Sequence, residues 1–183
     1  MRLLAISGSL RRTSYNRALL DAAAAECGPE IEFVFWNHLD SIPAYNEDVE
    51  IQPESVALLK DEITRADAVL FATPEYNASV PGSLKNALDW ISRPFADNPL
   101  REKRAAVIGA SQGAFGAAWA QAELRKILQT LGASVEQREL AVAHAQHAFA
   151  ADGLLRDPEQ RAMLTSILEA LRGQNPRQSR RLT

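Results

Sequence analysis

The segment ADAVLFATPEYNASVPGSLKNALDW, residues 66–90, passes from an apolar run through a polar loop into a helix-like pattern. Residues 68–72 are continuously apolar, which is typical of a parallel strand that is buried on both faces. A helix is expected from about Pro81, because proline suits the first turn of a helix. It should end before Pro94, whose ring disfavours helical backbone at the preceding residue. The segment therefore predicts a strand, a loop and a helix, the repeating unit of α/β folds.

The same unit recurs along the chain. Short apolar runs also occupy residues 3–6, 31–36 and 105–109, with a weaker one at 134–140, and helix-period segments occupy about 14–27, 53–65, 116–131 and 157–172. This alternation predicts a parallel sheet covered by helices on both faces. Five strands favour an α/β, flavodoxin-like three-layer sandwich with a five-stranded parallel sheet of order 2-1-3-4-5. A Rossmann domain would need a sixth strand. We expect one domain, residues 1–172, and a flexible tail, 173–183, that is poor in apolar residues.

Composition and charge narrow the classes of function. The chain has 183 residues, 46% of them hydrophobic, and a formal net charge of −3, which provides no electrostatic argument for a nucleic-acid partner. Cys27 is the single cysteine, so an intramolecular disulfide and a thiolate metal cluster are excluded, and we expect no metal site. No apolar stretch has the length of a signal peptide or of a membrane span. We expect a soluble, cytoplasmic protein with a small-molecule partner and no membrane partner.

The predicted topology selects three loops as the candidate ligand site. In open sheets of this order, ligands bind beyond the carboxyl ends of the strands, where the direction of winding reverses. The loops that follow strands 1, 3 and 4 would meet there, and they are SGSLRRTSYN (7–16), PEYNASVPG (74–82) and GASQGAFG (109–116). All three have unusual polar or glycine-rich compositions, so we expect them to form one site.

The first loop has the composition of an anion site. Backbone N–H groups at the start of a helix favour an anion, and the short side chains of Ser9, Ser14 and Asn16, together with Arg11, can complete its coordination. The loop contains neither the Walker pattern nor G-x-G-x-x-G. On these residues alone, a phosphate site and an ordinary polar turn with a serine N-cap both stay open.

The other two loops suit a flat polar ring. Tyr76 offers an aromatic face and Asn77 offers a donor and an acceptor, while Pro74 keeps the backbone extended as it leaves the sheet. In residues 111–116, glycines leave bare backbone that can approach a ring closely. Together the three loops predict a crevice with a phosphate at one end and a planar heterocycle at the other.

With these residues in place, the sequence resembles the NADPH-dependent FMN reductase family, and within it the branch of chromate or quinone reductases. The resemblance rests on GSLRRTSYN (8–16) and PEYNASVPGSLKNALDWISRP (74–94), which are similar to that family's two signature loops almost residue for residue. It extends from the first strand to about Ala170. Two long, compositionally odd motifs at the ends of two strands are far more specific than a single glycine pattern.

The resemblance implies an enzyme that holds FMN without a covalent bond and uses NADPH or NADH as co-substrate. The bound flavin would carry the chemistry, so no residue is expected to be catalytic. The expected acceptors are quinones, chromate, azo compounds or free flavin, and a homodimer or homotetramer is expected. The implied cofactor-binding residues are Ser9, Arg11, Ser14, Tyr15 and Asn16 toward the phosphate, Pro74, Glu75, Tyr76 and Asn77 at the ring, and Ser111, Gln112 and Gly113 in the third loop.

Glu75 is the residue of this set whose role the sequence leaves open. A carboxylate beside an electron-rich reduced ring is unfavourable, so we expect the side chain to turn away from the ring, toward backbone or a neighbouring subunit.

Three other functions occur in proteins of similar topology or binding chemistry. A flavodoxin-type electron carrier would bind FMN without turning over nicotinamide, although such carriers are usually more acidic than this chain. A phosphatase of similar topology would need a cysteine nucleophile in the first loop, and Cys27 lies at the far end of the following helix. A nucleotide-binding module without catalysis is the third possibility, and retained affinity for a nucleotide other than flavin would favour it.

Overall fold

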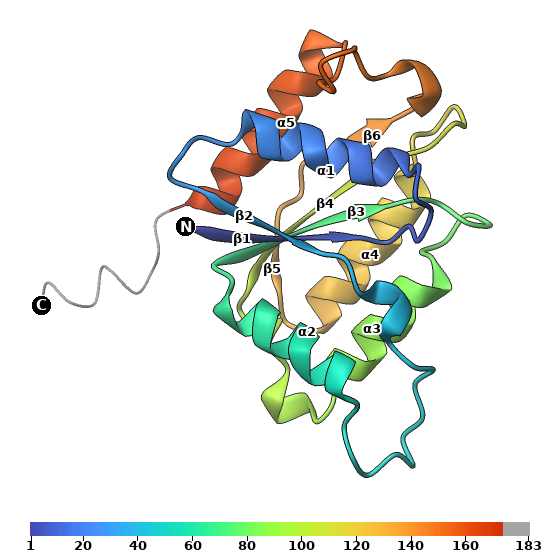
Figure 1. The fold of residues 1–183 in the computed structure, drawn as a ribbon, viewed down its shortest axis with the longest axis vertical. Helices are drawn as coiled ribbons and strands as arrows, with labels where there is room; N and C mark the ends of the chain where they lie inside the picture. Colours follow the sequence, from blue (N-terminus) through green and yellow to red (C-terminus); the bar gives the residue numbers. More distant parts are fainter. Residues whose placement is uncertain (174–183) are drawn as a thin grey trace, which may run out of the picture.

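The computed structural model of the chain describes residues 1–173 and contains a parallel sheet with helices on both faces (Figure 1). Its strands are β1 Arg2–Ser7, β2 Glu32–Trp36, β3 Ala68–Thr73, β4 Arg104–Ala110, β5 Ser134–Val135 and β6 Leu140–Val142. They follow the order β2-β1-β3-β4, and both β5 and β6 pair with the outer edge of β4. The predicted flavodoxin-like order 2-1-3-4-5 is confirmed.

The helices form the two outer layers. Those on one face are α1 Tyr15–Glu26 and α5 Pro158–Arg172, and those on the other are α2 Glu54–Arg65, α3 Gly82–Ile91 and α4 Ala118–Thr130 (Figure 1). Short 3-10 helices occupy Leu39–Ser41 (η1), Phe95–Asp97 (η2) and Ala145–His147 (η3). The start of α5 follows the sequence signal, because the Asp157 carboxylate accepts a hydrogen bond from the N–H of Glu159 and Pro158 stands at the first helical position.

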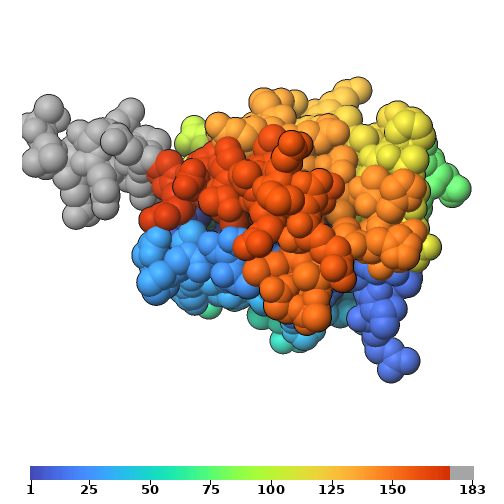
Figure 2. Space-filling view, turned by 90° about the horizontal axis from the view of Figure 1, so that it is seen from above, coloured from blue at the N-terminus to red at the C-terminus, as the bar shows by residue number. Residues whose placement is uncertain are grey.

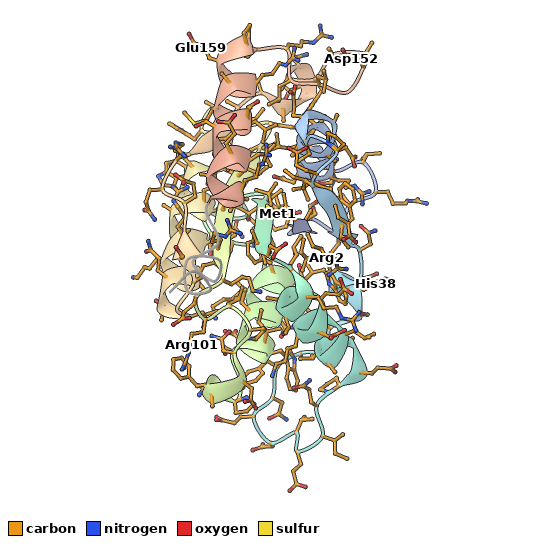
Figure 3. All side chains as sticks on the ribbon, turned by 90° about the vertical axis from the view of Figure 1, so that its left-hand side faces the viewer. Met1, Arg2, His38, Arg101, Asp152 and Glu159 are labelled. Atoms are coloured by element: carbon orange, nitrogen blue, oxygen red, sulfur yellow. The ribbon has the colours of Figure 1, made fainter. Side chains whose placement is uncertain are left out.

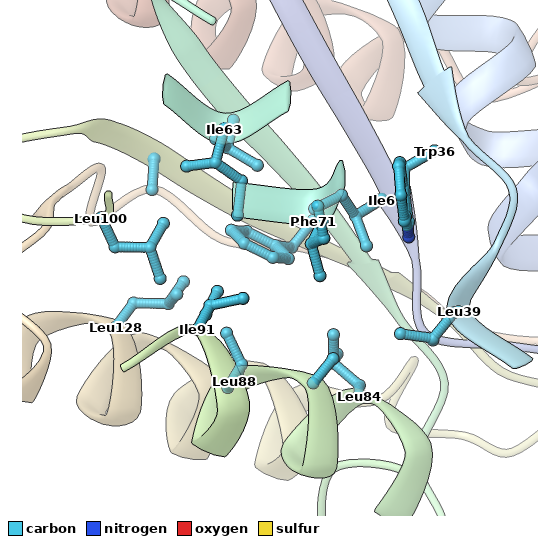
Figure 4. Packing of buried hydrophobic residues seen from close by; sticks show 14 of the residues in the cluster. Ile6, Trp36, Leu39, Ile63, Phe71, Leu84, Leu88, Ile91, Leu100 and Leu128 are labelled. Atoms are coloured by element: carbon cyan, nitrogen blue, oxygen red, sulfur yellow. The ribbon is translucent and has the colours of Figure 1, made fainter. Parts of the chain in front are cut away.

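Each face of the sheet has its own apolar core. On the side of α2, α3 and α4, Phe71 of β3 is buried among Leu84, Leu88 and Ile91 of α3 (Figure 4). On the side of α1 and α5, the core includes Leu19, Leu70 and Leu164, among others. Alternate residues of β3 therefore point into opposite cores, as the two-residue period of a strand requires.

Strand β3 is the centre of this architecture. All of its residues from Ala68 to Thr73 are buried, and it pairs with β1 on one side and with β4 on the other. A strand that is covered on both faces and on both edges is continuously apolar, which is why the run at 68–72 predicted it. Its carboxyl end places the PEYN residues at the middle of the sheet's edge.

The predicted fifth strand at 134–140 is divided into β5 and β6. Val135 pairs with Ala105, and Leu140 pairs with Ile108. Between these pairs the outer chain advances by five residues while β4 advances by three, so two extra residues bulge outward. Charged residues fill this bulge, and interruptions of that kind on an edge strand protect the sheet from pairing with another chain.

Helix α4 begins at Ala118, two residues later than the sequence predicted. Gly116 and Ala117 have φ values of +56° and +65°, which are left-handed and cannot continue into a right-handed helix. A Cβ atom on Gly116 would lie 2.4 Å from the carbonyl carbon of Ala141, so only glycine fits against β6 at this point.

The opposite edge of the sheet carries the amino ends of the strands. Figure 3 views the molecule from this side and shows Met1 and Arg2 at the start of β1. The Arg2 guanidinium donates to the carboxylate of Glu62 at 2.7 Å, which joins β1 to α2. Among residues 1–173, no helix is long and apolar enough to cross a membrane. The predicted tail, apart from Gly173, lies outside the described residues.

Candidate functional site

The three predicted loops leave the sheet at the same level. Ser7 at the end of β1 pairs with Ala72, and Thr73 at the end of β3 pairs with Gly109 of β4. The structure therefore brings together the first loop (residues 8–14), the middle loop (74–81) and the third loop (111–117) at the carboxyl edge of the sheet (Figure 1). This is the edge at which α/β sheets of this order bind ligands.

Ser14 is the N-cap of α1. Its buried hydroxyl oxygen accepts hydrogen bonds from the N–H groups of Asn16 at 3.2 Å and Arg17 at 3.3 Å. The interpretation of the first loop as a turn with a serine N-cap is therefore confirmed for this residue, and it leaves the phosphate interpretation open for the rest of the loop.

Asn16 joins α1 to the sheet. Its amide nitrogen donates to the carbonyl of Ala110 at 2.9 Å, and its amide oxygen accepts from the N–H of Ala110 at 2.9 Å. These two bonds satisfy the backbone N–H and C=O of Ala110, as a neighbouring strand would do at the end of β4. Asn16 is buried, where polar groups need such partners. Both polar groups of the side chain are thereby used within the protein.

The remainder of the first loop has free hydrogen-bond donors. Ser9 donates its N–H to the Ser7 hydroxyl at 3.2 Å, and residues 12–13 form a turn, but among the described residues the backbone N–H groups of residues 10–13 and 15 donate no hydrogen bond. Arg11 and Arg12 are exposed and form no ion pair with any described residue. Figure 2 shows this blue segment projecting from the molecule beside the orange segment of residues 140–157. Unpaired N–H groups at a helix start beside two guanidinium groups have the chemistry of a phosphate site.

The middle loop is a tight hairpin. Tyr76 and Ser79 exchange backbone hydrogen bonds of 3.0 and 3.1 Å, and Asn77 and Ala78 between them have φ values of +53° and +60°. Left-handed backbone at both central residues is the geometry of a type I′ turn. The turn leaves the Tyr76 side chain 47% exposed. The Asn77 side chain is exposed as well, so an aromatic face and an amide are available to a ligand.

Pro74 lies beneath the hairpin and is buried. A Cβ atom on Gly8 would lie 3.3 Å from its ring, so the first and middle loops touch at this point. The hydroxyl of Thr73 donates to the carbonyl of Pro74 at 2.8 Å, which fixes the chain as it leaves β3.

Glu75 turns away from the hairpin face and toward backbone, as expected. Its carboxylate accepts a hydrogen bond from the N–H of Ala120 at 3.1 Å, in the first turn of α4. At the other end of the hairpin, Glu123 of α4 accepts from the N–H of Val80 at 3.3 Å. Two carboxylates therefore link the hairpin to α4, one from the hairpin and one from the helix.

The third loop is held by β6 and the segment after it. Ser111 donates its N–H to Val142 and accepts from Ala145, each at 3.0 Å, and its hydroxyl accepts from the N–H of Gly113 at 3.2 Å. Gln112 and Gly113 are exposed. A Cβ atom on Gly113 would meet only the Ser111 hydroxyl, at 3.6 Å, so open space faces this backbone.

Gln121 is a site residue that the sequence did not single out. Its side chain is fully buried, its amide nitrogen donates to the carbonyl of Gly116 at 3.3 Å, and its amide oxygen has no partner among the described residues. A Cβ atom on Gly109 would lie 2.9 Å from that nitrogen, so Gln121 packs directly under the end of β4. The sequence signal that could have identified Gln121 is its place, as a polar residue, on the apolar face of the helix predicted at 116–131.

Two hollows flank the first loop. One, of about 290 Å³, lies between this loop and the residues that follow β2. The other, of about 400 Å³, lies between the start of α1 and the segment 145–149, and the half-buried Tyr15 lines it. The first hollow was not anticipated from the sequence, because it uses the connector after β2.

The comparisons with known proteins agree with this geometry. The family model of NADPH-dependent FMN reductase matches residues 1–147. The chain is 44% identical over 174 residues to an NAD(P)H-dependent FMN reductase of Pseudomonas aeruginosa, with 93% of each chain covered. It is 36% identical over 171 residues to a 2-hydroxy-1,4-benzoquinone reductase of a Burkholderia species, covering 92% of this chain and 93% of the relative.

A solved structure is similar at the level of both sequence and fold. The flavoenzyme NAD(P)H:acceptor oxidoreductase FerB of Paracoccus denitrificans superposes with a TM-score of 0.82 at 40% identity, over 93% of this chain and 94% of that one. The family model includes the sheet edge that carries the three loops, because it matches residues 1–147. This protein belongs to the NADPH-dependent FMN reductase family.

Proposed function

We propose that this protein is an FMN-dependent NAD(P)H oxidoreductase that reduces quinones and similar small acceptors. The observation that carries the proposal is the set of backbone N–H groups without partners among the described residues at 10–13 and 15, at the start of α1 and beside the side chain of Arg11. Family membership and relatives that are named FMN reductase and quinone reductase support the same activity.

The phosphate of FMN would be held by the free N–H groups, with Ser9 and Arg11 as side-chain partners. Ser14 and Asn16 belong to the same site but act on it through the protein, since their side chains bond to α1 and to Ala110. Tyr15 contributes from the wall of the neighbouring hollow. A helix start lowers the free energy of a bound phosphate through its N–H groups and dipole.

The isoalloxazine ring would lie against the middle and third loops. Tyr76 and Asn77 offer an exposed aromatic face and an amide, while Pro74 and Glu75 hold the hairpin that presents them. Ser111, Gln112 and Gly113 offer backbone with open space in front of it. When bound, FMN supplies the acceptance of hydride from NADPH or NADH and the passage of electrons to the acceptor.

The experiment is to purify the protein, record its visible spectrum and identify any bound flavin by mass. NAD(P)H oxidation is then followed at 340 nm with a benzoquinone. We expect FMN to be bound or to bind on addition, and nicotinamide to be consumed. A protein that neither binds FMN nor oxidises NAD(P)H would refute the proposal. FMN binding without nicotinamide turnover would identify an electron carrier instead.

We also propose that the protein forms homodimers or homotetramers in the cytoplasm, where reduced nicotinamide is produced. Phe115 and Trp119 support the first part, because they lie beside the proposed ring site with their side chains 61% and 52% exposed. Their ring centroids are 4.7 Å apart, so they form one apolar patch at the start of α4. Sedimentation of the protein and of a Trp119→Ser variant tests this, and a monomeric wild type would contradict it.

A further inference from the structure

Gln121 keeps an unpaired hydrogen-bond acceptor in the interior of the protein. Its side chain is fully buried, and its amide nitrogen donates to the carbonyl of Gly116 at 3.3 Å. Its amide oxygen accepts no hydrogen bond within the described part of the chain. An unpaired polar group in the interior destabilises the folded state, so a residue that keeps one requires an explanation other than stability.

The other buried amide side chains are fully paired. Asn98, which precedes β4, donates to the carbonyl of Leu131 at 2.8 Å and accepts from the N–H of Leu100 at 3.0 Å. Asn16 also uses both of its polar groups. Among residues 1–173, Gln121 is thus the buried amide that leaves one group without a partner. A purely structural amide is expected to resemble Asn98 instead.

The backbone that Gln121 contacts has an unfavourable conformation. Gly116 and Ala117, at the base of the third loop, have left-handed φ values of +56° and +65°. For alanine this conformation is uncommon, and it persists only where the surroundings enforce it. Gln121 contributes to that constraint twice, because its side chain holds the carbonyl of Gly116 and its backbone N–H donates to the carbonyl of Ala117 at 3.0 Å. Residues constrained in this way are concentrated at ligand sites.

The base of the third loop has no room to move inward. A Cβ atom on Gly109 would lie 2.9 Å from the side-chain nitrogen of Gln121 and 3.1 Å from the Cβ of Ala117. The base is therefore packed against the end of β4, beside the start of α4 (Figure 1). Open space lies only on the other side of the loop, in front of Gly113. A loop released from Gln121 would move in that direction.

We propose that Gln121 is a positioning residue for the flavin ring. It holds the third loop in the arrangement that the ring contacts, although this lowers the stability of the fold. Its role rests on the proposed function, in which the backbone of residues 111–113 meets the ring. Gln121 is fully buried, so it acts on the ring through Gly116. The loop presents the N–H of Gln112, which has no partner among the described residues. A donor that is fixed before the ring is reduced stabilises the added negative charge without rearranging.

The decisive variant is Gln121→Met, which keeps an unbranched side chain of similar length and removes both polar groups. The unpaired oxygen disappears, and the carbonyl of Gly116 regains a partner when the loop moves outward to water. These two effects on stability oppose each other, so we expect the Tm of the flavin-free protein to change by less than about 2 °C. The displaced loop should bind FMN about tenfold more weakly.

Two matched variants separate this role from that of an ordinary buried amide. Asn98→Leu removes a fully paired amide near the amino end of β4, so it should lower the Tm by about 4 °C or more and leave the affinity for FMN unchanged. Gln129→Met makes the same exchange as Gln121→Met on the exposed side of α4. The Gln129 side chain has no hydrogen bond among the residues that the structure describes, so neither quantity should change.

Four measurements are made on each variant. Thermal unfolding and amide hydrogen exchange use the flavin-free protein, and FMN titration and the midpoint potential of bound FMN use the loaded one. In Gln121→Met, exchange at residues 111–117 should become faster, because the loop opens more often. The midpoint potential should become more negative, since the displaced N–H of Gln112 stabilises the reduced ring less.

A Tm that falls as far as in Asn98→Leu, or a variant that does not fold, would show that Gln121 is structural and would overturn the proposal. An unchanged affinity for FMN, an unchanged midpoint potential or unchanged exchange at residues 111–117 would each overturn it as well. Failure of the proposed function gives a different pattern, because the wild type itself would not bind FMN. Exchange and Tm of the flavin-free Gln121→Met variant would then still decide whether Gln121 holds the loop.

Discussion

Replacing Glu75 by alanine should loosen the link between the middle loop and α4. The Glu75 carboxylate accepts from the N–H of Ala120 at 3.1 Å. Helix α4 has no side-chain hydrogen bond from its own N-cap, Ala117, and no acidic residue in its first turn. Glu75 thus supplies, from another loop, the anion that a helix start usually receives from its own sequence.

The size of the effect follows from this geometry. Hydrogen bonds to charged groups contribute roughly 1.5–3 kcal/mol, and removal of an N-cap costs about 1 kcal/mol. Glu75 is only partly buried, so water compensates part of the loss, and we expect Glu75→Ala to lower the free energy of unfolding by about 1–2 kcal/mol. For a chain of this length, that corresponds to a decrease in Tm of roughly 2–8 °C.

The assay is urea and thermal unfolding of the flavin-free protein, followed by circular dichroism. Glu75→Gln keeps an acceptor oxygen without the charge, so it should lose about half as much. Glu169→Ala is the matched control, because Glu169 is an exposed helical glutamate without a hydrogen bond or ion pair among the described residues. It should change stability by less than about 0.5 kcal/mol. The reasoning fails if Glu75→Ala is no more destabilising than Glu169→Ala.

Three further predictions use other features of the site. Gly116→Ala should destabilise the protein by roughly 3 kcal/mol or more, because the added Cβ would lie 2.4 Å from the backbone of β6. Gly82→Ala in α3 is the control, since open space surrounds that position, and it should be neutral or stabilise the protein by up to about 1 kcal/mol. Urea unfolding compares the two variants, and equal effects would contradict the packing at Gly116. Asn16→Ala should lower the free energy of unfolding by about 2 kcal/mol or more, since it leaves the N–H and C=O of Ala110 unpaired. Arg11→Ala should instead weaken FMN binding with little change in the Tm of the flavin-free protein. FMN titration and thermal unfolding of both variants check this, and a large stability loss in Arg11→Ala would count against its role as a ligand. Burial raises the pKa of Cys27 to about 11, so its alkylation by iodoacetamide at pH 8 should be roughly 100-fold slower in the native protein than in urea; comparable rates in the two states would show that the thiol is not shielded.

The order of the sheet was predictable because it depends on local patterns. The continuous apolar run at 68–72 and the alternation of strands with helices were enough to predict β3 and the positions of the three loops. The division of the last strand was not predictable. The charged residues between Val135 and Leu140 are compatible with an edge strand, and the bulge depends on how many residues β4 advances over the same distance.

The candidate site was predictable as a set of loops, but the partners of its side chains were not. Asn16 had the expected position at the start of α1, yet its partner Ala110 is 94 residues away, and only the paired fold shows that its amide is used there. Glu75 was expected to face backbone, but Ala120 could not be named as its partner. Gln121 was missed because its importance comes from the residues that fold against it, Gly109 and Gly116.

The polar residues of the site therefore divide by their partners into two functional groups. Ser14, Asn16 and Glu75 are satisfied by backbone of the protein, so they fix where the loops stand. The exposed ring of Tyr76 and the N–H groups of residues 10–13 and 15, which have no partner among the described residues, are available for a ligand. Substitutions in the first group should lower stability and FMN affinity together. Each lost hydrogen bond destabilises the folded state and also the position of the loop that the flavin contacts. Substitution of the Tyr76 side chain should change FMN affinity alone, since that side chain forms no hydrogen bond in the flavin-free fold among the described residues.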